Sequence, residues 1–117
     1  MDAVSQNLLR RWLRRRGLFT GRIARVRYYA ERHDLPDVPR ANELAIAGSE
    51  GSPKWLLLDC PCGYGHTILL PLSRPLNPHW TLRVDGDGPS ILPSVDRNRD
   101  RGTRCHFWLR DGKVQWV

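Results

Sequence analysis

Short apolar segments, most of them too short for helices, dominate the sequence after residue 42. They alternate with turns rich in glycine, proline and aspartate, a spacing that is typical of an all-β domain. We predict strands at residues 43–47, 55–59, 67–72, 80–84, 90–92, 106–110 and 114–117. Asp111-Gly112 separates the last two segments, and this dipeptide is a strong signal for a hairpin. The pattern therefore predicts a small, mainly antiparallel β-domain.

The N-terminal residues show a helical period instead. Between residues 3 and 16 the apolar positions fall on one helical stripe, which consists of Val4, Leu8, Leu9, Trp12 and Leu13. Residues 22–29 fit either a strand or a second helix, and the wholly polar residues 96–103 predict an exposed loop. We therefore expect a basic N-terminal α-helix within an arm of residues 1–30, followed by a β-domain of residues 31–117.

Size and composition fit one globular domain. The chain has 117 residues, of which 40% are hydrophobic and 26% are charged. No apolar run approaches the ~20 residues of a membrane span, and no secretory signal pattern is present, so we expect a cytoplasmic protein. Large aromatic side chains often fill small cores, and we expect four of the five tryptophans to do so here: Trp55, Trp80, Trp108 and Trp116.

The positive charge is concentrated at the N-terminus. The formal net charge is +7, and residues 1–28 carry all of the excess, with eight arginines and one acid. Such asymmetry indicates an acidic partner, either a protein surface or a nucleic acid. The residues expected to meet that partner cluster on the predicted helix, interleaved with aromatic side chains: Arg10, Arg11, Arg14, Arg15 and Arg16.

Three cysteines and two histidines have a spacing that suits a zinc site. Cys60 and Cys62 flank a turn, while Cys105 and His106 lie far away in sequence. Two ligands from a turn and two from a remote segment are how small zinc domains complete a tetrahedron. His66 is the alternative ligand, and an odd number of cysteines suits a metal better than disulfides. In the simpler interpretation the cysteines are buried apolar groups and the histidines are hydrogen-bonded.

Several of these motifs together resemble a known family. They are CPCGYGH (60–66), Trp80-Thr81-Leu82, Asp85-Gly86, Pro89-Ser90-Ile91 and HFWLRDGKVQW (106–116). Their combination is similar to domain-of-unknown-function family 6527, a group of small bacterial proteins, over roughly residues 55–117. The resemblance implies metal binding and a genetic context of ubiquitin-like conjugation, with E1-like, E2-like and JAB-peptidase-like proteins. The chain departs from the family pattern at Tyr64 and Thr103, where the family has cysteines.

The sequence favours a non-enzymatic function. We expect a small adaptor with a structural zinc in a ubiquitin-like pathway, binding an E1-like, E2-like or ubiquitin-like component, and we assign no catalytic residue. One alternative is a nucleic-acid-binding protein that uses the arginine-rich helix. Another is a small zinc hydrolase, and Cys62 with His66 could also form a thiolate–imidazole pair.

Overall fold

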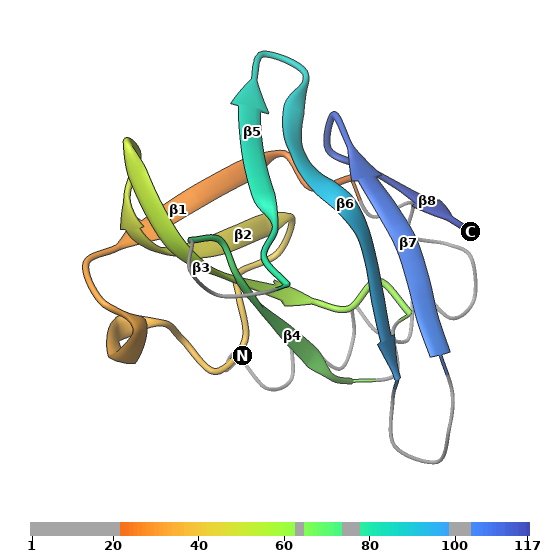
Figure 1. Cartoon of the computed structure of the whole chain (residues 1–117), viewed down its shortest axis with the longest axis horizontal. Coiled ribbons are helices and arrows are strands. Elements are labelled where there is room, and N and C mark those ends of the chain that lie inside the picture. Colours follow the sequence, from red (N-terminus) through yellow and green to blue (C-terminus); the bar gives the residue numbers. More distant parts are fainter. Residues whose placement is uncertain (1–21, 63–64, 74–77, 99–103) are drawn as a thin grey trace.

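Eight strands in two four-stranded sheets make up the computed structural model, which describes residues 22–62, 65–73, 78–98 and 104–117 (Figure 1). The first sheet has the order β1-β2-β3-β4 and the second has the order β5-β6-β7-β8. The strands of the first sheet are β1 (Arg25–Tyr29), β2 (Glu43–Ser49), β3 (Ser52–Asp59) and β4 (Thr67–Pro71). Those of the second are β5 (Thr81–Asp85), β6 (Gly88–Asn98), β7 (Arg104–Arg110) and β8 (Lys113–Trp116). A 3-10 turn, η1 (Arg32–Asp34), lies between β1 and β2.

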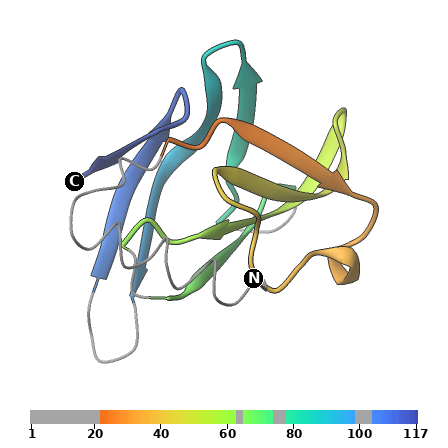
Figure 2. The same cartoon turned by 180° about the vertical axis from the view of Figure 1, so that it is seen from behind.

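The two sheets share one apolar core. Strands with one buried face alternate inward apolar and outward polar side chains, and β7 follows this rule along its whole length. Its inward residues are Cys105, Phe107 and Leu109, which pack in one cluster with Leu56 and Leu58 of β3. Figure 2 shows the two sheets from behind, with β6 and β7 side by side in the second. One face of β7 therefore packs in the core, and its other face lies on the outside of the second sheet.

The prediction of a mainly β, mainly antiparallel domain is confirmed in its broad form. Every predicted strand is found, and residues 22–29 contain β1, which pairs parallel with β2 while the other described pairs are antiparallel. The predicted N-terminal helix, with its arginines, lies outside the described residues. The arm expected at residues 1–30 includes β1, and the structure builds that strand into the first sheet. The described part of the chain contains no helix long and apolar enough to cross a bilayer.

Two other expectations are wrong. Residues 96–98 are not loop, because β6 continues to Asn98 and pairs residue by residue with the start of β7. The tryptophans do not form much of the core, since Trp80 is buried but Trp116 is 53% exposed. Trp116 lies on the edge strand β8 and meets Phe107 only edge to face. Mostly leucine and isoleucine side chains, together with Phe107, fill the core instead.

The turn between β7 and β8 also links the two sheets. Asp111 and Gly112 both have positive φ, as a two-residue hairpin requires. The Ile23 N–H, just before β1, donates to the Gly112 carbonyl (2.7 Å), and the Gly112 N–H donates to the Pro89 carbonyl (2.8 Å). The predicted Asp111-Gly112 hairpin is thus confirmed, and it is packed directly against the first sheet.

This packing makes Gly112 sensitive to substitution. We expect Gly112→Ala to lower the free energy of unfolding by about 2 kcal/mol or more, because φ is 77° and the new Cβ would overlap the Ile23 carbonyl oxygen. Gly86→Ala is the control, since a Cβ there meets no atom within 4 Å. Urea denaturation of both variants measures the difference. Equal stabilities would contradict this account of the turn.

Candidate functional site

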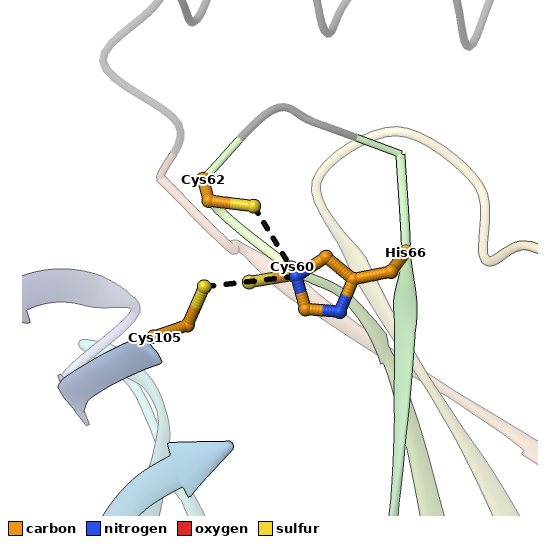
Figure 3. Close-up of side chains that lie close together, drawn as sticks. All are labelled: Cys60, Cys62, His66 and Cys105. Atoms are coloured by element: carbon orange, nitrogen blue, oxygen red, sulfur yellow. Dashed lines mark hydrogen bonds between the residues drawn. The ribbon is translucent and has the colours of Figure 1, made fainter. Parts of the chain in front are cut away.

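A cluster of three thiols and one imidazole lies between the sheets (Figure 3). Cys60 and Cys62 follow β3, and His66 precedes β4, so all three come from one connection. The Cys60 N–H donates to the His66 carbonyl (3.0 Å), which brings the two ends of this connection together. Cys105 approaches from β7 in the opposite sheet. The four potential ligand atoms all lie within 4.8 Å of one another.

The geometry of this cluster suits a tetrahedral zinc ion. The His66 Nε2 atom lies 3.3 Å from the Cys62 Sγ and 3.6 Å from the Cys105 Sγ. Zn–S bonds of about 2.3 Å and a Zn–N bond of about 2.0 Å would separate sulfur and nitrogen by about 3.5 Å. Three thiolates and an imidazole are also a common donor set of structural zinc sites. The residues present could therefore hold zinc.

The electrostatics of the cluster also favour a bound metal ion. The hydrogen bond with Cys62, together with burial, raises the pKa of the Cys60 thiol far above its ordinary value, and the neighbouring Cys105 adds to this effect. Several thiolates in one buried place repel one another unless a cation compensates for their charge. The arrangement is therefore unfavourable for bare thiolates and favourable for thiolates around a metal ion.

His106 does not lie in this cluster. Because side chains alternate along a strand, Cys105 points into the core and His106 points to the outer face of the second sheet. There the His106 Nε2 atom lies 2.9 Å from the Ser94 Oγ atom of β6. Of the predicted ligands, the structure thus brings together Cys60, Cys62 and Cys105 and adds the alternative His66.

A β-bulge presents Ser94 to His106. Ile91 pairs with Leu109 and Val95 with Phe107, so residues 92–94 of β6 stand opposite Trp108 alone. Bulges of this kind often change the direction of a side chain beside an active site. Two hydrogen bonds to main-chain carbonyls hold the pair: the Trp80 indole N–H donates to the Ser94 carbonyl (3.3 Å), and the Val117 N–H donates to the His106 carbonyl (3.0 Å).

Charged residues flank the serine–histidine pair on the same hairpin. Asp96 stands directly opposite His106, and the Arg104 guanidinium donates two hydrogen bonds to the Asp96 carboxylate. These bonds to Arg104, with a smaller contribution from His106, hold the pKa of Asp96 below its ordinary value. The same ion pair raises the pKa of Arg104. A carboxylate is therefore present beside the imidazole at neutral pH.

A hydroxyl within hydrogen-bonding distance of a histidine is the basic arrangement for nucleophilic catalysis. The imidazole can accept the proton of the Ser94 hydroxyl and make its oxygen a better nucleophile. Ser94 and His106 are both half-buried on a sheet face whose neighbouring Asp96, Arg104 and Arg110 are exposed. An open face of this kind suits a polypeptide substrate better than a small molecule.

Sequence reasoning did not find Ser94. The residue lies in no recognisable nucleophile motif, and its partner is 12 positions further along the chain. The Cys62–His66 contact proposed as a thiolate–imidazole pair does exist, within the metal-like cluster. The five arginines expected to bind a partner lie outside the described residues.

Comparison with known protein families identifies the family of the chain. The family model described as "Bacterial ubiquitination-like system serine protease (BubE)" matches residues 31–117 of the chain, which include the cluster, Ser94 and His106. No curated protein and no solved structure matches the chain.

Proposed function

Because the chain belongs to the family of bacterial ubiquitination-like system serine proteases, we propose that it hydrolyses a peptide bond with Ser94 as nucleophile and His106 as general base. The observation that carries this proposal is the 2.9 Å contact between the Ser94 Oγ and the His106 Nε2. The family description supplies the class of reaction, and the contact selects the residues. The non-enzymatic adaptor favoured by the sequence alone becomes the second candidate.

The chemistry follows from these two residues. His106 Nε2 takes the proton of the Ser94 hydroxyl while Oγ attacks the carbonyl carbon of the substrate. When the C–N bond breaks, the protonated imidazole gives that proton to the leaving amine, and an ester to Ser94 remains. Water, deprotonated by the same imidazole, then hydrolyses the ester and regenerates the serine. The hydrogen bonds from Trp80 and Val117 to the main chain of the pair preserve its geometry during these steps.

We propose that the metal centre is structural and is separate from this chemistry. Cys60, Cys62, Cys105 and His66 would hold one zinc ion, which would cross-link the β3–β4 connection to β7. With four protein ligands it would keep no open position for water. Its contribution is to fix β7, the strand that also presents His106 on its other face.

We propose a protein of the ubiquitin-like class as the substrate. The family description refers to a ubiquitination-like system, and the pair lies on an open sheet face that a flexible chain terminus could reach. The arginine cluster at residues 10–16 is a proposed contact for an acidic surface of such a partner. That contact remains a prediction from the sequence.

The test is cleavage of a bacterial ubiquitin-like protein that carries additional residues at its C-terminus. We expect the purified full-length chain to release those residues, and mass spectrometry of the products identifies the bond. The His106→Gln variant should release none, because it lacks the base. Cleavage that persists in this variant, or a wild-type protein that cleaves neither extended nor conjugated forms, would contradict the proposal.

The second candidate is a zinc-stabilised adaptor in the same system. The metal-like cluster favours it, because a structural metal needs no catalysis to account for its presence. An adaptor would bind its ubiquitin-like, E1-like or E2-like partner equally well after Ser94→Ala and would cleave nothing. Calorimetric binding beside the cleavage assay therefore separates the two candidates.

A further inference from the structure

We propose that Arg110 and Lys113, beside Trp108, form a subsite that binds an acidic side chain of the polypeptide substrate. The inference rests on the proposed function, because it names a property of the substrate that the same sheet face would take. It depends on three features of β7 and β8: a row of side chains that leads away from His106, two cations at the end of that row, and neighbouring carboxylates that interact with other arginines.

The row of side chains connects the Ser94–His106 pair to the two cations. His106, Trp108 and Arg110 are two residues apart on β7, so they point to the same outer face of the second sheet. At a rise of about 3.4 Å per residue, Arg110 lies about 14 Å along the strand from His106, a distance that an extended substrate spans in about four residues. A polypeptide cleaved at Ser94 can therefore reach Arg110.

The surface between the pair and the cations is apolar. Leu92 alternates with the buried Ile91 on β6, so its side chain lies on the outer face, where it is 43% exposed. Trp108 of β7 is half-buried and stands opposite residues 92–94. Leu92 and Trp108 therefore offer an apolar contact to the substrate residues that lie next to the cleaved bond.

Two cations stand opposite each other at the far end of the row. Arg110 of β7 pairs with Lys113 of β8, and both side chains are exposed. Direct cross-strand partners have Cβ atoms about 4.5–5.5 Å apart, and like charges at such positions destabilise a hairpin. An anion bound between the two side chains would remove this repulsion. The pairing therefore favours a carboxylate ligand.

Neighbouring carboxylates do not neutralise these cations. Among the described residues, neither Arg110 nor Lys113 takes part in an ion pair. The carboxylates of the surrounding strands and turn interact with other arginines, in three ion pairs: Arg83 with Asp85, Arg83 with Asp111, and Arg104 with Asp96. The positive charge of the subsite therefore suits an acidic group of a partner.

Trp108 helps to hold the arginine of the subsite in place. The Arg110 guanidinium lies over the Trp108 ring, with its central carbon 4.2 Å from the ring centroid. A guanidinium held against an aromatic ring can still donate from its N–H groups to both oxygens of a carboxylate. Side-chain cations at an open position suit an acidic side chain, whereas a C-terminal carboxylate is typically captured by main-chain N–H groups.

The test moves one glutamate, position by position, through the residues on either side of the cleaved bond in a C-terminally extended bacterial ubiquitin-like protein. The full-length wild type should cleave fastest with the glutamate about four residues from the bond. Arg110→Gln should lower kcat/KM for that substrate about tenfold to hundredfold, as expected for a lost hydrogen bond between charged groups, and mainly by raising KM. The matched control is Arg27→Gln, an exposed arginine of β1 in the other sheet, which should leave both constants unchanged.

A second variant separates recognition from folding. Lys113→Glu places an acid opposite Arg110, so the melting temperature should stay the same or rise. The same variant should lose the preference for glutamate, because its own carboxylate would occupy Arg110. An unchanged preference for glutamate in Lys113→Glu and in Arg110→Gln would overturn the inference.

The subsite and the proposed function can fail separately. If the wild type cleaves the glutamate substrate and its alanine counterpart equally, the subsite is wrong and the proposed function stands. If it cleaves nothing, calorimetric titration with the glutamate-containing protein decides: weaker binding by Arg110→Gln supports the subsite, and equal binding overturns it. If Arg110→Gln instead weakens binding of single-stranded DNA and leaves binding of the protein unchanged, the occupant is a nucleic acid and the inference is wrong.

Discussion

Replacing Ser94 with alanine is expected to abolish hydrolysis, lowering kcat/KM roughly 10⁴-fold or more. The substitution removes one oxygen, the atom that would form the ester with the substrate. Its main-chain carbonyl would still accept the Trp80 hydrogen bond, and Ser94 is not part of the core cluster. The domain should therefore remain folded, and the loss should lie in the chemical step.

Covalent labelling measures the same property without a known substrate. A fluorophosphonate probe reacts with an activated serine, and mass spectrometry of the wild-type protein should locate the label on Ser94. The control is Ser90→Ala on the same strand. Ser90 is 2% exposed, and its hydroxyl accepts from the Asp111 N–H at 2.9 Å, so the variant should keep the label. Labelling that persists in Ser94→Ala would exclude Ser94 as the nucleophile.

The features of the fold that could be predicted are those that depend on residues close together in the sequence. Turn residues and short apolar runs gave the strands, and Asp111-Gly112 gave the hairpin, because these features depend on residues next to one another. The end of β6 does not read as a strand in the sequence, because residues 96–98 are all polar. Their strand structure comes from pairing with β7 and from the ion pair to Arg104, neither of which leaves a local signal.

The site was harder to predict because it depends on which strands face each other. The spacing of the cysteines indicated a cluster, but choosing between His66 and His106 required knowing that Cys105 lies on a regular strand. Strand alternation then separates adjacent side chains onto opposite faces, and the closed β3–β4 connection supplies His66 instead. Ser94 was not predictable at all, since its contact with His106 depends on the register of β6 against β7, which leaves no local signal.

Loss of the metal ion is expected to have the second large effect, which is unfolding. The adjacent residues Cys105 and His106 provide a direct test, because only Cys105 belongs to the proposed zinc site. The wild type should contain about one zinc ion per chain by elemental analysis of untagged protein. Cys105→Ser and His66→Gln should lose that zinc and unfold, because zinc binding to such sites contributes on the order of 10 kcal/mol to folding. His106→Gln should keep its zinc and its stability, and lose only hydrolysis.

The contrast between Cys105 and His106 is the decisive part, because the two residues are adjacent and belong to the same strand. A general disruption of β7 would affect zinc content, melting temperature and hydrolysis together in both variants. If the two sites lie on opposite faces of β7, the variants should differ. Cys105→Ser should change zinc content, melting temperature and hydrolysis, whereas His106→Gln should change hydrolysis alone. If His106→Gln releases the zinc and His66→Gln retains it, the ion is bound by the ligand set expected from the sequence. The 2.9 Å contact with Ser94 would then have no catalytic meaning.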